Sequence, residues 1–211
     1  LKLHQSITRK FLSRQKQNEH ILDIDAFSIF ANKHSAENTY KGPKGYMPIV
    51  GHLSNLDWCL HYEFRKGNES PNSRIPAFIK DCLKALPNGH KVTHFRSDGA
   101  AYQEEVFHLL DKKNIQFTIT GCKNSAMLNE IKLIDSDAWR RFKTKEGILT
   151  DRDYAETYAA MNGTDFFRIV VQRWKNPELL LFEDTAPYCY HVICTNIPES
   201  VKSTTDIIYW H

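Results

Sequence analysis

The sequence has no apolar run long enough to cross a membrane, since a transmembrane helix needs roughly 18 such residues. It has only five cysteines, an odd number, and no two of them form a Cys-x-x-Cys pair. Neither a disulfide framework nor a zinc ribbon is therefore expected, and reduced cytosolic thiols are the default. The first twenty residues also lack the apolar core of a signal peptide.

Sequence motifs of several large enzyme classes are missing as well. No P-loop, no Gly-x-Gly-x-x-Gly fingerprint and no Gly-x-Ser-x-Gly elbow occurs. The 211 residues are 41% hydrophobic and 12% aromatic, which are globular values. The formal net charge of +3 permits nucleic-acid binding without indicating it by itself. The length suits one domain, or one domain with a large insertion.

Hydrophobic periodicity predicts an alternation of strands and helices after a basic amphipathic helix within the first 20 residues. Strands are predicted over 21–31, 47–53, 56–64, 92–98 and 115–119, and helices over 76–86, 101–113 and 124–134. Beyond them, aromatic and β-branched segments predict strands over 153–160, 166–174, 178–183 and 188–195. The chain thus changes from α/β to mostly antiparallel β.

This order of elements, three antiparallel strands and then parallel strands with helices, resembles an RNase H-like domain. The predicted fold class is α/β, an RNase H-like mixed sheet with a β-rich insertion toward the C-terminus. The expected parts are a basic helix (1–20), the core (21–134), the insertion (135–205) and the start of a return to the core (206–211).

Two acidic residues need explanation, because strands disfavour aspartate. Asp25 lies on the first strong strand, and Asp98 ends the fourth. If those strands are neighbours, about 4.8 Å apart, the two carboxylates can share a divalent ion. The alternatives are that Asp98 is a helix N-cap or part of an Asp-Gly turn, and that Asp23 is a solvated charge at a strand end.

Basic and aromatic residues suggest contacts with phosphates and bases. Lys41 and Lys44 are expected DNA contacts, because they flank glycines on a predicted loop where backbone and ammonium groups can approach a phosphate; the alternative is a solvated hairpin turn. Basic and aromatic residues also interleave at 139–141 and 173–175, which suits stacking on nucleic acid, although amphipathic edges would look the same. A histidine-based zinc site is not expected, because neither His90 and His94 nor His52 and His61 have suitable spacing or placement.

Four stretches, in their order and separations, resemble bacterial insertion-sequence transposases of the DDE class. These stretches are Leu22-Asp-Ile-Asp-Ala-Phe27, Tyr40-Lys-Gly-Pro-Lys-Gly-Tyr46, Phe64-Arg-Lys-Gly-Asn68 and Phe95-Arg-Ser-Asp-Gly-Ala-Ala-Tyr102. The resemblance covers roughly residues 20 to 211. It implies an RNase H-like catalytic core that hydrolyses and joins DNA strands at transposon ends.

The resemblance assigns roles to individual residues. The first two catalytic, metal-binding acids of the family fall on Asp25 and Asp98, with Asp23 the weaker choice for the first. Arg96 lies just before the second acid, where it can meet a phosphate or buttress a carboxylate. The implied cofactor is Mg²⁺ or Mn²⁺ in a two-metal site. The implied partner is double-stranded DNA, both transposon ends and target, bound by a homodimer at the bacterial nucleoid and not at a membrane.

The sequence departs from the family pattern in two ways. Phe27 stands where the family often has Thr, and no third acid lies in a matching motif. The remaining glutamates considered are Glu156, Glu178, Glu183 and Glu199. The expectation is a truncated, inactive fragment that ends before the catalytic Glu. Two alternatives remain open: an RNase H-like nuclease or resolvase that uses the same aspartates, and a non-catalytic DNA-binding module with a vestigial pair.

Overall fold

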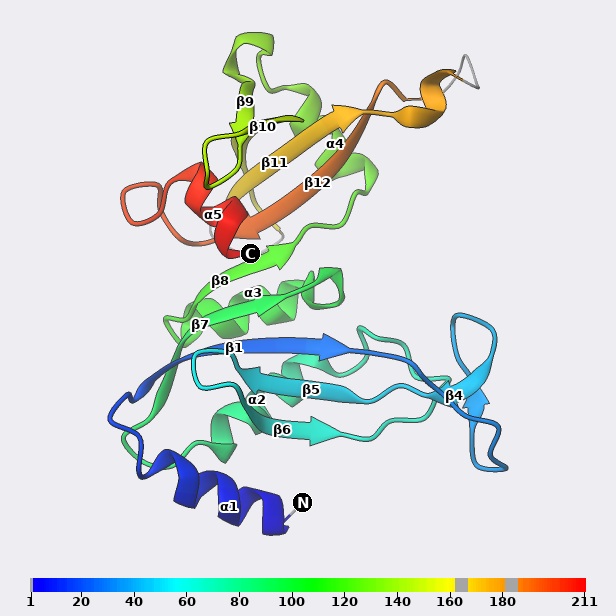
Figure 1. Ribbon diagram of the computed structural model, residues 1–211, viewed down its shortest axis with the longest axis vertical. Coiled ribbons are helices and arrows are strands. Elements are labelled where there is room, and N and C mark those ends of the chain that lie inside the picture. Colours follow the sequence, from blue (N-terminus) through cyan, green and yellow to red (C-terminus); the bar gives the residue numbers. More distant parts are fainter. Residues whose placement is uncertain (1, 162–166, 181–185) are drawn as a thin grey trace. The chain divides into compact units, whose positions relative to one another are not determined.

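The computed structural model of the protein describes residues 2–161, 167–180 and 186–211 (Figure 1). Its residue contacts divide the chain into two compact units, Leu1–Gln116 and Phe117–His211. In these described ranges no helix has both the length and the apolar character to cross a bilayer.

The first unit is built on a mixed sheet with the strand order β6-β5-β1-β7. Its strands are β1 (Glu19–Ala26), β5 (Ile49–Leu53), β6 (Trp58–Glu63) and β7 (Lys91–Ser97). β5 is antiparallel to both β1 and β6, whereas β7 runs parallel to β1. The predicted neighbourhood of the first and fourth long strands is therefore confirmed, and their carboxyl ends lie at the same edge of the sheet.

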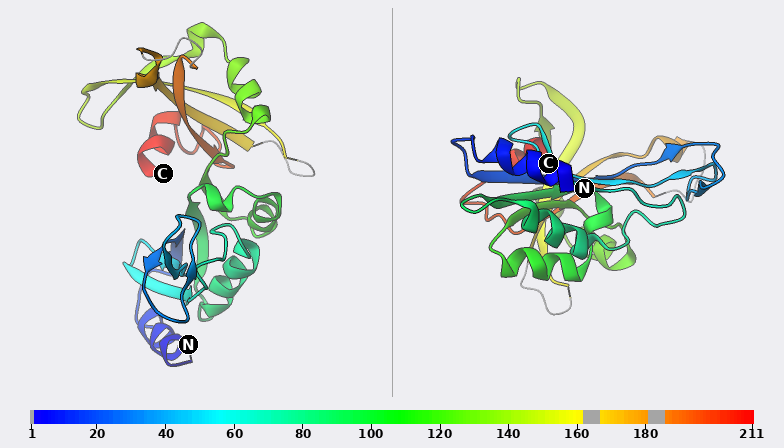
Figure 2. Two further views of the ribbon diagram at one scale, coloured as in Figure 1. Left: turned by 90° about the vertical axis from the view of Figure 1, so that its right-hand side faces the viewer. Right: turned by 90° about the horizontal axis from the view of Figure 1, so that it is seen from below.

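Helices cover this sheet because each has one apolar stripe to bury. They are α1 (Lys2–Leu12), α2 (Ile75–Ala85) and α3 (Glu104–Lys112). α2 and α3 lie on one face of the sheet (Figures 1 and 2). Phe78 of α2 and Phe107 of α3 are fully buried, as are Leu22 of β1 and Phe95 of β7. α1 lies along the edge strand β6, where Phe11 stacks on the Trp58 ring at 4.0 Å.

A small second sheet follows β1, with the order β2-β4-β3. Its strands are β2 (Ile29–Phe30), β3 (Glu37–Asn38) and β4 (Lys44–Tyr46). The predicted single strand over 21–31 is wrong, because the chain leaves the main sheet after Ala26. At that point Phe27 donates its backbone N–H to the carbonyl of Pro48, and a proline has no N–H with which to continue the ladder.

The second unit is an antiparallel sheet with the order β8-β12-β11-β10-β9. Its strands are β8 (Gln116–Thr120), β9 (Arg140–Lys143), β10 (Leu149–Ala159), β11 (Phe167–Lys175) and β12 (Tyr188–Thr195). Its helices are α4 (Ser125–Lys132) and α5 (Thr204–Trp210), which contact β10 and β11 respectively. Ile207 of α5 packs into a core with Val170, Ile193 and Ile197.

Two further element predictions need correction. The strand predicted over 178–183 is a 3-10 turn at Pro177–Leu180, because the Asn176 side chain caps the Glu178 N–H and proline fixes the backbone; residues 181–183 lie outside the described residues. The helix predicted over 101–113 is a 3-10 turn, Gly99–Ala101, and then α3.

Candidate active site

β1 and β7 bring two carboxylates to one edge of the first sheet. Their parallel register pairs Asp23 with Arg96 and Ile24 with Ser97. The next residue on each chain is an aspartate, Asp25 on β1 and Asp98 directly after β7. The buried Ser97 hydroxyl fixes this register by donating to the Ile24 carbonyl at 3.2 Å.

The Asp25 carboxylate is affected by its neighbour's charge. Partial burial is the largest cause of its raised pKa, and the negative charge of Asp98 raises the pKa further. A hydrogen bond involving the Ala26 backbone acts in the opposite direction. A cation bound between the two carboxylates would remove this repulsion.

Asp98 is oriented by the turn that follows it. Its Oδ1 accepts a hydrogen bond from the Ala100 N–H at 3.0 Å, which makes Asp98 the N-cap of the Gly99–Ala101 turn. The N-cap role of Asp98, which the sequence suggested as an alternative to metal binding, is therefore present, but it uses only one of the two carboxylate oxygens. Within the described ranges Oδ2 accepts no hydrogen bond, so the cap and a metal ligand are compatible in one side chain.

Asp23 lies on the same exposed face of β1 as Asp25, but a cation from the protein already neutralises it. Arg96 donates from Nε to Oδ1 of Asp23 at 2.8 Å and from Nη2 to Oδ2 at 2.5 Å. Arg96 also donates to the Ser54 hydroxyl at 3.2 Å. Of the two roles predicted for Arg96, the structure shows the carboxylate buttress, on Asp23, and this bidentate pair braces β1 against β7.

The two lysines predicted to bind DNA lie on the small sheet that follows β1. Both Lys41 and Lys44 are exposed. Lys44 begins β4 and is not in a loop as predicted. The Lys41 ammonium lies 5.6 Å from the centre of the Tyr40 ring, and neighbouring Gly42 has a φ of 99°, which glycine adopts without strain. Lys41 therefore lies in the turn that precedes β4 and Lys44 on the first residue of β4, and the small sheet that carries them follows the carboxyl end of β1 (Figure 1).

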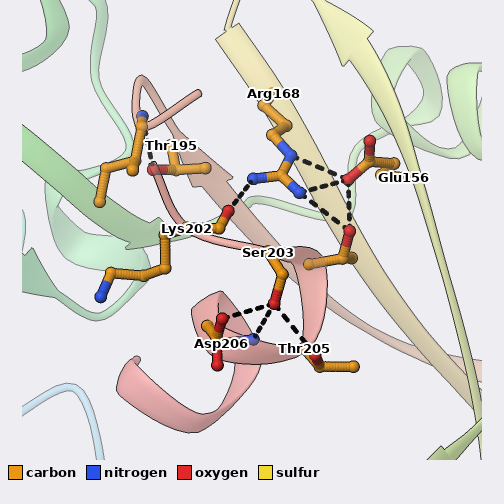
Figure 3. Close-up of polar contacts among 9 residues, drawn as sticks. Glu156, Arg168, Thr195, Lys202, Ser203, Thr205 and Asp206 are labelled. Atoms are coloured by element: carbon orange, nitrogen blue, oxygen red, sulfur yellow. Dashed lines mark hydrogen bonds and ion pairs between the residues drawn. The ribbon is translucent and has the colours of Figure 1, made fainter. Parts of the chain in front are cut away.

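Glu156 is held in a structural network in the second unit (Figure 3). Its Oε2 accepts hydrogen bonds from Nε and Nη2 of Arg168, at 2.8 and 2.5 Å, and from the Thr204 hydroxyl at 2.6 Å. Arg168 is 2% exposed and also donates to the Lys202 carbonyl. Glu156 is therefore committed to anchoring α5 on β10 and β11. Glu199 lines a pocket of about 330 Å³ beside this network, whereas Glu183 lies outside the described residues.

The basic and aromatic stretches of the second unit stack mainly on one another. The Arg173 guanidinium lies 3.9 Å from the Trp139 ring centre and 4.6 Å from that of Tyr188. Arg152 lies 4.7 Å from the Trp174 ring centre. These faces are engaged in cation–π contacts within the protein. The predicted base-stacking role of 139–141 and 173–175 thus competes with contacts that already exist.

Three of the four histidines predicted not to form a zinc site, His52, His90 and His94, contact other side chains. The His20 and His90 rings stack, and their Nε2 and Nδ1 atoms lie 2.9 Å apart. His94 Nδ1 contacts the Thr93 hydroxyl at 2.9 Å, and His52 contacts Asp57 at 3.2 Å. His61 belongs to a group that the sequence analysis missed, with two acids from other positions.

The raised pKa of Asp25 gives a testable stability effect. A carboxyl group whose pKa is higher in the folded state stabilises the fold below its unfolded pKa, and this contribution is lost as pH rises through the folded pKa. Without metal, Asp25→Asn is therefore expected to unfold at a higher temperature than the wild type at pH 7, and the difference should vanish in acid. Thermal unfolding with EDTA between pH 7 and 3.5 measures this. The exposed Asp137→Asn is the control, and a less stable Asp25→Asn at pH 7 would refute the effect.

Comparison with known families identifies the family of the chain. The sequence matches the model of a family described as Transposase DDE domain group 1, over residues 1–201. The chain belongs to this family of transposase domains. No curated protein matches the chain.

Comparison with solved structures shows a related fold. The chain resembles the piggyBac transposase of a synaptic complex with hairpin DNA, determined by cryo-electron microscopy, with a TM-score of 0.51 and 11% sequence identity. The similarity covers 90% of this chain and 37% of the piggyBac chain. The mixed α/β architecture is thus shared with a transposase, and this chain spans well under half of that protein.

Proposed function

We propose that the chain acts in DNA transposition, as an RNase H-like catalytic core in which Asp25 and Asp98 bind Mg²⁺ or Mn²⁺. Family membership supports the general activity. The observation that carries the site is the placement of the two aspartates at the carboxyl ends of adjacent parallel strands, one residue beyond the paired Ile24 and Ser97.

The residues present fit a hard divalent cation. Both side chains offer carboxylate oxygens, the ligand type that Mg²⁺ and Mn²⁺ prefer. Asp98 is held by the Ala100 N–H through Oδ1 and has Oδ2 available. Burial is the largest cause of the raised pKa of Asp25, and the repulsion by Asp98 that adds to it is what a shared cation would relieve. When bound, such cations activate water or a 3′-hydroxyl and stabilise the leaving oxygen of a phosphoryl transfer.

The other residues hold this pair in place. The Asp23–Arg96 pair joins β1 to β7 two residues before Asp25 and Asp98, and the Ser97–Ile24 hydrogen bond joins them one residue before. Because the backbone is fixed there, the two carboxylates are ordered before DNA arrives, which lowers the entropic cost of binding. Lys41 and Lys44 provide positive charge on the same unit, suited to DNA phosphates.

The partner proposed is double-stranded DNA, both transposon ends and target, held by two copies of the protein. This part of the proposal rests on the resemblance of the motifs to bacterial insertion-sequence transposases, which also supports action at the bacterial nucleoid. The third acid of the family is assigned to none of the described glutamates, and Glu156 is already bound by Arg168.

Strand breakage at defined DNA ends tests the proposal. The purified protein is incubated with labelled duplexes from the DNA on either side of its own gene, and with scrambled duplexes. Metal-dependent breaks at the ends alone, with Mg²⁺ or Mn²⁺ and not with Ca²⁺, are expected, and they would overturn the sequence-based expectation of an inactive fragment. Equal breakage of scrambled DNA would instead indicate an RNase H-like nuclease. Binding without breakage in every metal would fit either the inactive fragment or a DNA-binding module, and binding of Mn²⁺ at Asp25 and Asp98 would separate these two.

A further inference from the structure

A second group of metal-ligating side chains lies on the edge strand of the first sheet, away from β1 and β7. His61 and Glu63 are two residues apart on β6, so they project from the same face. Asp81 lies on α2, which packs against β6. One ligand atom from each of the three residues lies within 4.8 Å of the others. β5 separates β6 from β1, so this group is distinct from the Asp25–Asp98 pair.

The His61 side chain has a buried nitrogen without a hydrogen-bond partner among the described residues. The residue is 5% exposed, and this nitrogen is Nδ1. Buried polar atoms of this kind are rare, because each costs free energy unless something satisfies it. One face of the ring is covered by Phe78 of α2, with ring centres 5.3 Å apart. The histidine is therefore fixed in place beside two carboxylates.

Charge and protonation also suit a cation. Burial is the largest cause of the lowered pKa of His61, and a neutral imidazole is the form that coordinates a metal. The charges that act on it are those of Asp81 and Glu63, which raise its pKa, and of His4 on α1, which lowers it. Lys84 pairs with one oxygen of Asp81 at 3.1 Å on the exposed side of α2. Two carboxylates thus lie beside the imidazole, with the lysine to one side.

We propose that His61, Glu63 and Asp81 bind a divalent transition-metal ion of the zinc type, which clamps the edge strand β6 to α2. One imidazole nitrogen and two carboxylate oxygens form a mixed donor set that favours zinc or cobalt over magnesium. Three protein ligands leave a fourth position for water. The role of the ion is structural, since it joins two elements that are otherwise held by apolar packing, and it does not depend on the proposed function.

Cobalt absorption and zinc-dependent unfolding test this site. The wild-type chain is titrated with Co²⁺ and then Zn²⁺, and visible absorption, circular dichroism and the unfolding temperature are followed. A tetrahedral Co²⁺ spectrum that Zn²⁺ displaces, and a higher unfolding temperature with Zn²⁺, are expected. Both signals should persist in the double variant Asp25→Asn, Asp98→Asn.

Matched variants separate this site from general metal binding. Glu63→Gln and Asp81→Asn remove one ligand each from partly exposed positions, and Glu37→Gln removes an exposed glutamate elsewhere. Each ligand variant is expected to lose at least about 10-fold in Co²⁺ affinity and to lose the zinc-induced shift, while folding normally without metal. Glu37→Gln should behave as wild type. Unchanged Co²⁺ affinity in both ligand variants, or no spectrum in the wild type, overturns the proposal.

Discussion

Asp98→Asn is expected to reduce metal-dependent strand breakage at the DNA ends by more than about 100-fold, since even residues that only support a metal ligand cost 10- to 100-fold. The substitution keeps the size of the side chain and an oxygen that can accept from the Ala100 N–H. It removes the charge that pairs with the cation. Asp25→Asn should have a similar effect, and the two substitutions together should cost little more than either one, because they remove a single shared site.

Controls make this loss specific. Asp137→Asn removes an exposed carboxylate in the second unit and should leave breakage unchanged. Asp23→Asn weakens the Arg96 brace and is expected to reduce activity less than either ligand variant, because both ligands remain. Breakage that survives at near wild-type rates in both Asp25→Asn and Asp98→Asn would contradict the assignment.

Arg168→Met is expected to cost about 3–5 kcal/mol of the unfolding free energy of the second unit, the range for breaking a buried ion pair by removing one partner. The Arg168 side chain is 2% exposed, and it satisfies Glu156, the Lys202 carbonyl and the Thr204 hydroxyl (Figure 3). Methionine fills much of the volume but leaves all three acceptors without that donor. The polar connection between β11 and the start of α5 is lost, while the packing of Ile207 on Val170 remains.

Urea unfolding followed by tryptophan fluorescence measures this loss, because three of the four tryptophans, Trp139, Trp174 and Trp210, lie in the second unit. Arg141→Met is the control, since Arg141 is 49% exposed in its pair with Asp153 and should cost less than about 1 kcal/mol. Adding Glu156→Leu to Arg168→Met should recover part of the loss, because the unpaired carboxylate is gone. A loss of less than about 1 kcal/mol of unfolding free energy in Arg168→Met would show that the Arg168–Glu156 network does not stabilise the second unit.

The core of the first unit was predictable because its signals are local. Alternating apolar residues define β1 and β7, and the order of elements predicts that they are neighbours. The position of Asp25 and Asp98 follows from that adjacency. The break after Ala26 was not predictable from periodicity, since Ile29 and Phe30 continue the apolar pattern and only the pairing with Pro48 ends the strand.

Other parts depend on contacts between distant residues. α5 is rich in Thr and Ile, which have low helix propensity, and it is stabilised by the Ser203 cap and by Arg168, 36 residues away from Thr204. The His61, Glu63 and Asp81 group joins a strand to a helix, and only the packing of α2 on β6 reveals it. The histidine spacings considered in the sequence contained neither acid.

Anomalous diffraction from crystals soaked in Mn²⁺ tests the central claim most directly. We predict an Mn²⁺ peak within bonding distance of carboxylate oxygens from both Asp25 and Asp98, absent from crystals of the Asp98→Asn variant. Crystals with no peak between these two side chains, while Mn²⁺ occupies other sites, would contradict the account.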